Sequence, residues 1–299
     1  MKILVTGSDG QVGTELRIQS VGHDFHLIYT DKAQMDICNL DEIDSVISST
    51  SPDLILNLAA YTNVELAEEE EDLAYLINAD AVKNLAEVCK DRSLPLIHIS
   101  TDYVFSGKKE QDYTEDDQPS PINIYGASKL LGEQYLREIL PNHIILRSSW
   151  LFSNHSGHNF INAILNKAKS QDHIEVINDI FGCPTSVRSL VECIFSILRE
   201  YSRTKELQNG TFHFVNSPAS SWHIFATHIV DLAFKNKIIK KPVLVEPVSN
   251  ENYETKASRP SNSSMSCNRI KTAYKIEQVN WRSELTQIMK DYNSEHGST

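Results

Sequence analysis

A tyrosine and a lysine four residues apart, Tyr125 and Lys129, are the pair in this sequence best suited to acid–base chemistry at a carbonyl group. Residues four apart share one face of a helix. An ammonium beside a phenol favours the phenolate and lowers the pKa of the tyrosine. We expect Tyr125 to donate a proton to a carbonyl oxygen as a hydride reaches the carbon. An exposed helix pair has the same spacing, so the surroundings decide between the two interpretations.

Thr101 follows an apolar segment, residues 96–100, that we predict to be a strand. Open α/β sheets bind ligands at the carboxyl ends of their strands, so the Thr101 hydroxyl can hold the same carbonyl oxygen as Tyr125. His98 lies inside this strand, and we expect a packed core histidine there rather than a ligand. The combination predicts reduction or oxidation of a carbon–oxygen bond.

A glycine-rich turn opens the chain, with Gly7, Gly10 and Gly13 between the apolar residues 3–5 and a predicted helix from about residue 11. Gly7 permits the tight turn, Gly10 lets a pyrophosphate approach the backbone, and Gly13 lets the helix pack on the strand. The N-terminus of that helix would face the phosphates. The spacing differs from the common Gly-x-Gly-x-x-Gly fingerprint, but its place between strand and helix predicts a dinucleotide site.

Asp31 and Lys32 follow the second predicted strand, residues 26–29, where the adenosine ribose of a dinucleotide would lie. The Asp31 carboxylate can bond both ribose hydroxyls, which favours NADH, whereas Lys32 can meet a 2′-phosphate, which favours NADPH. The choice between the two cofactors stays open at this point. Asp36 and Ile37 could frame the adenine, with an ordinary turn as the alternative.

Strands and helices alternate through the first half of the sequence. The apolar runs at 54–58, 96–100 and 144–147 are typical of parallel strands covered on both faces. Predicted helices of this half cover residues 41–48, 68–90 and 125–138. Beyond residue 150 the alternation weakens, although helices at 160–169, 187–201 and up to 234 and a strand at 212–215 are still expected.

This pattern predicts an α/β fold with a Rossmann-like doubly wound parallel sheet and a smaller mixed α/β C-terminal substrate domain. Residues 1–150 would form the NAD(P)-binding domain, which also receives roughly residues 180–215. Residues 151–299 would be predominantly substrate-binding.

The composition is that of a globular protein with a sizeable core, with 40% hydrophobic and 23% charged residues in 299. The net charge of -12 argues against nucleic acid or an anionic membrane as a partner. The first residues form too short an apolar run for a signal peptide, and no run approaches a membrane span. We therefore expect a cytoplasmic protein.

The cysteine and histidine spacings give no support for a disulfide framework or a metal centre. Five cysteines without a Cys-x-x-Cys pair predict buried free thiols in a reducing compartment. His155 and His158 are three residues apart, as some metal ligands are, but a third ligand is not evident. We predict no metal site.

Seven blocks spread along the chain carry a family pattern. They read TGSDGQVG (6–13), NLAAYTNVELAE (57–68), STDYVF (100–105), RSSW (147–150), INDIFGCPT (177–185), SW (221–222) and RPSNS (259–263). Together they resemble the extended short-chain dehydrogenase/reductases, in particular the dTDP-4-dehydrorhamnose reductase family. Two positions depart from that pattern, because Glu65 stands where the family usually has Asp and RSSW differs from the usual Arg-Thr-Ser-Trp.

The resemblance implies that Thr101, Tyr125 and Lys129 are catalytic and that Tyr103 and Trp150 contact a deoxysugar. An aromatic ring such as Trp150 can pack on the apolar face of a 6-deoxysugar. With the glycine turn, the expected cofactor-binding residues are Gly7, Gly10, Gln11, Val12, Gly13, Asp31, Lys32, Asp36, Ile37, Ala59, Ala60, Tyr61, Tyr125 and Lys129. Arg259 is our candidate for the substrate diphosphate, with a plain surface arginine as the alternative.

The family implies reduction of the 4-keto group of dTDP-4-dehydro-6-deoxy-L-mannose to dTDP-L-rhamnose by NADPH or NADH, with Tyr125 as proton donor. Some relatives dimerise through Mg²⁺ held by glutamates. Glu15 could match one such position, but we expect an exposed helix glutamate there.

Two alternatives remain at this point. One is a reductase of another nucleotide-linked deoxyhexulose, and the other is a non-catalytic NADP-binding subunit resembling the regulatory subunit of methionine adenosyltransferase. The expected partner is a nucleotide sugar, without nucleic acid or membrane, and the protein would be a monomer or a homodimer.

Overall fold

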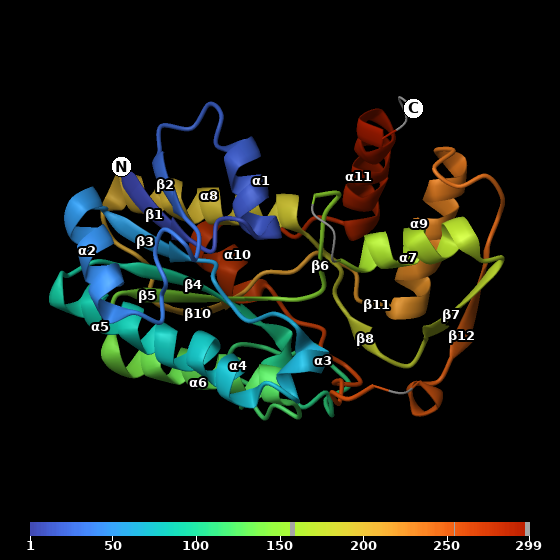
Figure 1. Cartoon of the computed structure of the whole chain (residues 1–299), viewed down its shortest axis with the longest axis horizontal. Helices are drawn as coiled ribbons and strands as arrows, with labels where there is room; N and C mark the ends of the chain where they lie inside the picture. The colour runs from blue at the N-terminus through green and yellow to red at the C-terminus, as the bar shows by residue number, and fades with distance from the viewer. Residues whose placement is uncertain (156–158, 254, 297–299) are drawn as a thin grey trace.

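A six-stranded parallel sheet forms the centre of the computed structural model, which describes residues 1–155, 159–253 and 255–296 (Figure 1). Its strands are β1 (Lys2–Thr6), β2 (His26–Thr30), β3 (Leu54–Asn57), β4 (Leu96–Thr101), β5 (His143–Ser148) and β10 (Gly210–His213). Their order is β10-β5-β4-β3-β1-β2, and every neighbouring pair is parallel. The predicted Rossmann-like doubly wound sheet is confirmed, with the reversal of strand order between β1 and β3.

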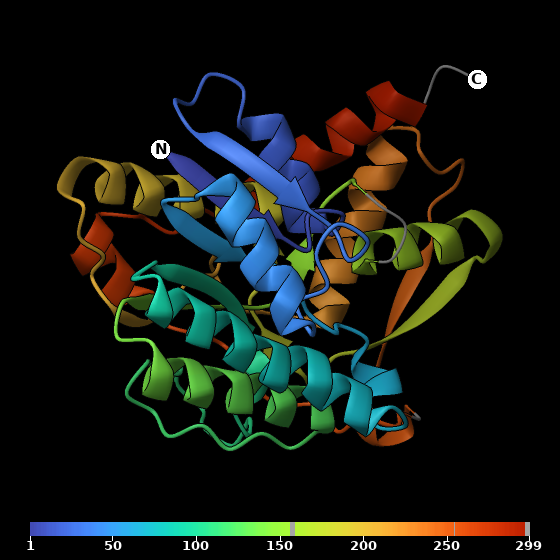
Figure 2. The same ribbon diagram turned by 60° about the vertical axis from the view of Figure 1, so that its left-hand side comes forward.

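Helices cover both faces of the sheet because its strands are apolar on both sides. One face carries α1 (Gln11–Gln19), α8 (Val187–Thr204) and α10 (Asn268–Tyr274), and the other carries α2 (Leu40–Thr50), α5 (Ala81–Asp91) and α6 (Ile124–Ile139). Alternate strand residues serve opposite faces: Ile3 and Val5 join the first core and Leu4 the second. Figure 2 shows α5 and α6 side by side along their face.

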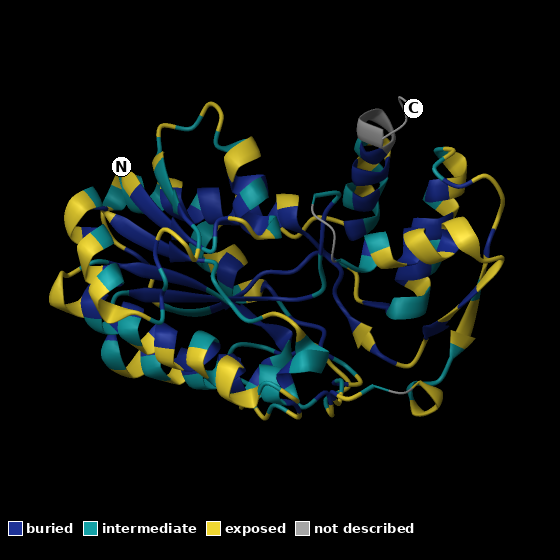
Figure 3. Cartoon of the chain, viewed as in Figure 1, coloured by how far each residue is buried: buried dark blue, intermediate teal, exposed yellow. Residues whose placement is uncertain are grey.

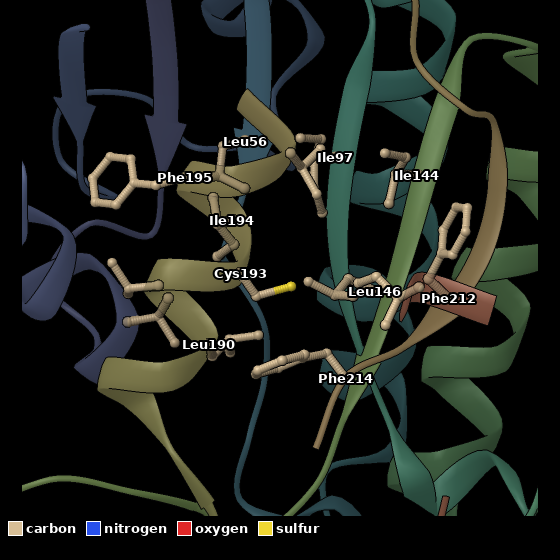
Figure 4. Close-up of a cluster of buried hydrophobic side chains, with 14 of the residues drawn as sticks. Leu56, Ile97, Ile144, Leu146, Leu190, Cys193, Ile194, Phe195, Phe212 and Phe214 are labelled. Atoms are coloured by element: carbon tan, nitrogen blue, oxygen red, sulfur yellow. The ribbon is translucent and has the colours of Figure 1, made fainter. Parts of the chain in front are cut away.

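The core beneath α8 shows how this packing works (Figure 4). Leu190, Cys193 and Ile194 point from α8 toward strand residues such as Ile97 and Leu146. Figure 3 shows that the strands of the sheet are buried and that the outer surfaces of the helices are exposed. The rigid sheet therefore holds the carboxyl ends of its strands in fixed positions, and the candidate site lies there.

The part of the second half of the chain that does not join the sheet packs around its own hydrophobic core. It contains α7 (Phe160–Ser170), α9 (Trp222–Lys235), α11 (Trp281–His296) and the parallel pair β7 (His173–Ile177) and β12 (Leu244–Val248). Two short pairs connect it to the sheet: β6 (Leu151–Phe152) with β9 (Thr185–Ser186), and β8 (Phe181–Gly182) with β11 (Ser220–Ser221). The helices α10 and α11 were not predicted. The domain division at residue 150 stays a prediction.

The helix predicted for residues 68–90 is confirmed over residues 71–91, but it is not one regular α-helix. The chain instead forms α3 (Val64–Ala67), α4 (Glu71–Tyr75), a π-helical turn (Leu76–Asp80) and then α5. The side chain of Asn78 explains the interruption, because it bonds the backbone N–H and carbonyl of Tyr61 at 2.9 and 3.0 Å. Such π turns are frequent near functional sites.

In the described ranges, all helices are too short or too polar to cross a membrane.

Candidate active site

Two adjoining cavities lie at the carboxyl ends of β1, β3 and β4, where doubly wound sheets bind their ligands. The first cavity, about 380 Å³, is bounded by residues that follow β1, β2 and β3. The second cavity, about 510 Å³, is bounded by residues that follow β1, β3, β4 and β5 and by α6. The two share Gly7, Gly10, Leu58, Ala60 and Thr62, so they form one groove across the reversal point of the sheet.

Glycine occupies the three positions of the opening turn for different structural reasons. Gly7 has φ of 62°, and a Cβ there would lie 2.6 Å from the Ala59 Cα. A Cβ on Gly13 would lie 2.2 Å from the carbonyl oxygen of Ser8. At Gly10, by contrast, the nearest atom would be the Gly7 oxygen at 3.5 Å. Packing within the chain therefore requires glycine at 7 and 13, while Gly10 keeps the backbone accessible from the groove.

The N-terminus of α1 is ready to receive an anion. Its N-cap is Gly10, which offers no side-chain acceptor, and the first turn contains no acidic residue. Other helices are capped, α2 by Asn39 and α9 by Ser221. Because the first N–H groups of a helix need acceptors and carry partial positive charge, a diphosphate fits at this end of α1.

The first cavity has an acidic residue and a basic residue at its rim. The Asp31 carboxylate accepts the Gln34 backbone N–H at 2.9 Å, which closes the turn after β2. The Lys32 side chain is 81% exposed, and its Nζ lies 4.0 Å from Asp36. The residues predicted around the cofactor that line this cavity are Gly7, Gly10, Asp31, Lys32, Asp36, Ile37, Ala59 and Ala60.

Tyr61 lies apart from both cavities. Its hydroxyl donates to Glu70 at 2.8 Å, and its backbone is held by Asn78. Thr62 lines both cavities instead. Gln11, Val12 and Gly13 line the second cavity, as do Thr101, Tyr103, Tyr125, Lys129 and Trp150.

The second cavity brings the predicted hydroxyl groups together. Thr101 ends β4, and Tyr125 lies in the first turn of α6, where Asn123 caps the helix by accepting the Gly126 N–H at 2.7 Å. The Thr101 hydroxyl lies close enough to the Tyr125 hydroxyl to lower its pKa, while it donates its own proton to Asp102 Oδ1 at 3.1 Å. The ring of Tyr103 meets that of Tyr125 edge to face, with centroids 5.6 Å apart. A carbonyl oxygen beside both hydroxyls could accept from Tyr125, and from Thr101 when the Thr101 proton turns from Asp102 toward it.

Lys129 lines the same cavity but does not have the predicted effect on Tyr125. Its Nζ donates to the Ile99 carbonyl at 2.8 Å and lies 3.2 Å from His98 Nε2. Burial raises the pKa of Tyr125 to about 12, and the nearby Thr101 hydroxyl only partly offsets this rise. The expected lowering of the tyrosine pKa is therefore wrong for this arrangement, because the amine faces β4. Burial also lowers the pKa of Lys129 to about 8, against the opposing effect of Glu133.

Trp150 forms one wall of the second cavity. Its indole stacks on that of Trp222, with centroids 3.6 Å apart. A Cβ on Gly182 would lie 2.5 Å from the Trp150 ring, so glycine at 182 leaves the space that the indole fills. Trp150 has φ of 45°, a left-handed conformation that costs about 1–3 kcal/mol and that surrounding contacts must maintain. The backbone N–H of Thr185, donating to the Trp150 carbonyl at 3.1 Å, is one such contact.

Comparisons with known proteins agree with this geometry. A family model described as the RmlD substrate binding domain matches residues 1–294. The dTDP-4-dehydrorhamnose reductase of Sinorhizobium fredii is 35% identical over 97% of each chain. The chain belongs to the dTDP-4-dehydrorhamnose reductase family.

Solved structures extend the comparison. A dTDP-4-dehydrorhamnose reductase from Bacillus anthracis, in complex with NADP, is 34% identical and superimposes with a TM-score of 0.88 over 97% of this chain and 99% of its own. A UDP-glucose 4-epimerase from Thermotoga maritima superimposes with a TM-score of 0.79 at 16% identity, covering 99% of each chain, which shows a shared fold.

The family's usual Asp is replaced by Glu65, and this glutamate holds Arg259. Arg259 Nη2 donates to Glu65 at 2.7 Å, and Glu65 also accepts the backbone N–H groups of Lys256 and Ala257. Arg259 therefore does not line the second cavity. It lines a third, adjoining cavity of about 190 Å³, which shares Trp222 with the second.

The exposed position expected for Glu15 is wrong. Glu15 is only 6% exposed, because it pairs with His155 at 2.7 Å and accepts from Gln19 at 2.7 Å. These contacts tie α1 to the segment after β6. Within the described ranges, no cluster of three His, Cys, Asp or Glu side chains could hold a metal ion. His158 lies outside the described residues.

Asp102 is a residue of the site that the sequence did not single out for a role. It is buried at 1% exposure, lines the second cavity and accepts the Thr101 hydroxyl at 3.1 Å. Among the residues that the structure describes, its Oδ2 has no hydrogen-bond partner. Burial raises the pKa of Asp102 to about 7, although the nearby hydroxyls of Ser263 and Thr101 oppose this. Its place beside Thr101 in the STDYVF block was the only available signal.

We expect Asp102→Asn to stabilise the protein in a pH-dependent way. The carboxyl has a pKa of 3.8 when unfolded and about 7 when folded, so the folded state holds the extra proton between these values. Stability from this group rises as pH falls from 7 to 4, and the full burial penalty, up to about 4 kcal/mol, applies above 7. The asparagine removes that penalty, so its advantage in thermal unfolding should be largest at pH 8 and vanish near pH 4.

Asp116→Asn is the matched control, because Asp116 is an exposed partner of Arg269. Its melting temperature should follow the wild-type curve across the pH range. An Asp102→Asn curve parallel to wild type would contradict the raised pKa.

Proposed function

We propose that this protein reduces the 4-keto group of dTDP-4-dehydro-6-deoxy-L-mannose (dTDP-4-dehydrorhamnose) with NADPH or NADH, giving dTDP-L-rhamnose. The observation that carries this proposal is the second cavity, which gathers Thr101, Tyr125 and Lys129 beside Trp150 and continues into the first cavity at the glycine turn. The printed names of the relatives, and the NADP bound by the Bacillus anthracis protein, support the same reaction.

The groove fits a nicotinamide dinucleotide at both ends. The uncapped N-terminus of α1 and the accessible backbone at Gly10 suit the diphosphate. The first cavity, with Asp31 and Lys32 at its rim, suits the adenosine half, and the second suits the nicotinamide half. When bound, the dinucleotide supplies the hydride.

The side chains of the second cavity would perform the acid–base part of the reaction. Tyr125 would donate the proton that converts the 4-keto oxygen to a hydroxyl, and the Thr101 hydroxyl would hold that oxygen in place. Trp150 and Tyr103 would pack against the deoxysugar. Lys129 would stabilise the phenolate that remains after proton donation.

The nucleotide end of the substrate would extend into the third cavity. Arg259 and Lys167 both line it, and Trp222 joins it to the second cavity. The Nε of Arg259 is buried without a hydrogen-bond partner in the described part of the chain. A buried guanidinium donor favours an acceptor such as a diphosphate oxygen, so the Glu65 pair would orient Arg259 for the substrate.

The rim of the first cavity predicts a specific effect on cofactor preference. Lys32→Ala should weaken NADPH binding by roughly two- to fivefold, the range of an exposed ion pair, and leave NADH binding nearly unchanged. Of the two cofactors, only NADPH carries a 2′-phosphate that Lys32 could contact in addition to Asp36. Dissociation constants for both cofactors, from quenching of protein fluorescence, test this.

Lys83→Ala is the control, because the Lys83–Glu87 pair has the same 4.0 Å separation and helical-type spacing as Lys32–Asp36. It should alter neither constant. Equal losses for NADPH and NADH in Lys32→Ala would contradict a contact with the 2′-phosphate.

The reaction itself is tested with purified protein, NADPH and dTDP-4-dehydrorhamnose. We expect NADPH oxidation that depends on the sugar, with dTDP-L-rhamnose identified by NMR. Turnover with another 4-keto nucleotide sugar alone would favour the different-deoxyhexulose alternative. No turnover with any such sugar, together with retained NADPH binding, would favour a non-catalytic binding subunit.

The proposal extends to compartment and assembly. We place the activity in the cytoplasm, where the five free cysteines would stay reduced. The protein would act as a monomer or a homodimer without a bridging magnesium ion, since Glu15 is already paired with His155.

A further inference from the structure

A line of buried polar side chains runs behind the second cavity, from β1 to α6. The Thr6 hydroxyl donates to Asn57 Oδ1 at 2.6 Å, and Asn57 Nδ2 lies 2.9 Å from His98 Nδ1. His98 Nε2 in turn lies 3.2 Å from Lys129 Nζ. All four side chains are at most 2% exposed, so each polar atom must find its partner within the protein.

The orientation of the Asn57 amide is fixed by the backbone. The Ala59 N–H points at Asn57 Oδ1 at 3.2 Å, and a backbone N–H can only donate. An acceptor must therefore occupy that position, which assigns it to the oxygen. The Nδ2 group, a donor, faces His98.

This amide fixes the tautomer of His98. Its Nδ1 receives an N–H from Asn57 and so carries no proton. Burial, which is complete, holds the pKa of His98 well below its usual value, so the ring is neutral. The single proton of the ring is therefore on Nε2, the atom that faces Lys129.

The tautomer of His98 in turn determines the protonation state of Lys129. An ammonium has three donors and no acceptor, so it would place N–H against N–H at His98. A neutral amine has two donors and one lone pair. It can accept from His98 Nε2–H while donating to the Ile99 carbonyl at 2.8 Å. Only the neutral form satisfies both contacts.

We propose that His98 is a positioning residue for Lys129, holding it against β4 as a neutral amine, and that Lys129 takes up a proton when it leaves His98 for the cofactor. The first half of this inference rests on the hydrogen-bond chain alone. The second half rests on the proposed function, because it needs the dinucleotide in the groove.

The charged groups around Lys129 do not change its assignment as a neutral amine. Glu133, one turn further along α6, raises the pKa of Lys129, but its carboxylate is already bonded by Arg147 and Ser100. Arg137 is its third partner. Burial outweighs Glu133 and lowers the pKa of Lys129 to about 8.

The test is a pH titration of Lys129 by NMR in protein labelled at the lysine side-chain carbons, with Lys129→Met to assign the signal. We expect a pKa of about 8 or lower in the wild type. In His98→Gln the amide oxygen can accept from an ammonium, so the pKa should rise by about one unit or more. His143→Gln is the control, because His143 bonds the Leu140 carbonyl and should leave the Lys129 titration unchanged.

A wild-type Lys129 pKa near the ordinary 10.5 would overturn the proposal even if His98→Gln fails to fold. A pKa unchanged by His98→Gln would overturn it too.

Calorimetry of NADPH binding near pH 9, in two buffers of different ionisation enthalpy, tests whether Lys129 takes up a proton when the cofactor binds. We expect uptake of most of one proton in the wild type and less in His98→Gln. Binding without proton uptake would refute the movement to the cofactor. Loss of sugar turnover alone would count against the proposed reaction and not against His98, since neither measurement uses the sugar.

Discussion

Tyr125→Phe is expected to lower kcat by about a hundred- to ten-thousandfold, the usual contribution of a positioned general acid. Phenylalanine keeps the ring that meets Tyr103 edge to face, and it removes only the hydroxyl beside Thr101. The cavity should therefore keep its shape, and NADPH should bind with nearly unchanged affinity. Steady-state kinetics with the 4-keto sugar and a fluorescence titration of NADPH measure the two effects separately.

Tyr135→Phe is the matched control, because Tyr135 lies on the same helix away from both cavities and under the amine of Lys83. Its kcat should remain within about twofold of wild type. A near-normal kcat in Tyr125→Phe would contradict the assignment of Tyr125 as the general acid. A large loss of NADPH affinity would instead point to a structural role.

The raised pKa of Tyr125 suits the direction of the reaction. Reduction needs a proton on the phenol, and burial keeps it there because it raises the pKa to about 12. Proton donation then leaves a buried phenolate, which is unfavourable without a nearby cation. A Lys129 that gains its proton on reaching the cofactor would provide that cation at the step that needs it. The contact with His98 and the proton donation by Tyr125 are therefore consistent.

The strands β1, β3, β4 and β5 were predictable because they are continuous apolar runs buried on both faces. Residues 54–58 and 96–100 are of this kind, and they form β3 and β4 within one or two residues. The π turn within the helix predicted for 68–90 was not predictable, since it accompanies a contact of Asn78 with Tyr61, 17 residues away. Local periodicity does not contain such a contact.

The same limit applies to the site. The glycine turn and the Tyr125–Lys129 spacing identified the groove because their geometry is local. The direction of the Lys129 amine on α6 depends on His98 and Asn57, which lie on β4 and β3. The sequence placed His98 correctly in the core, but it could not show which atom faces the lysine. The contact between Glu65 and Arg259, which are 194 residues apart, could not be predicted from the sequence either.

Arg147→Met is expected to have the largest effect on stability, about 3–5 kcal/mol in urea unfolding. Arg147 and Glu133 are both buried and form a two-bond pair at 2.9 and 2.6 Å. Although burial alone would raise the pKa of Glu133, Arg147 and its other partners lower it to about 2. Without the arginine, a charged carboxylate would remain in the core with too few partners. Since Glu133 also accepts from Ser100, the residue before Thr101, the loss should weaken the site as well.

Arg137→Met tests whether burial of the ion pair is the reason for the large stability loss expected in Arg147→Met. Arg137 contacts the same carboxylate at 3.1 Å, but its side chain is 35% exposed, so its removal should cost only about 0–1 kcal/mol. The double variant Glu133→Met/Arg147→Met should recover most of the stability lost in Arg147→Met, because no buried charge is left unpaired. If Arg147→Met costs no more than Arg137→Met, the pair does not stabilise the junction of β4, β5 and α6. The positions of Thr101 and Lys129 would then have to be maintained by apolar packing alone.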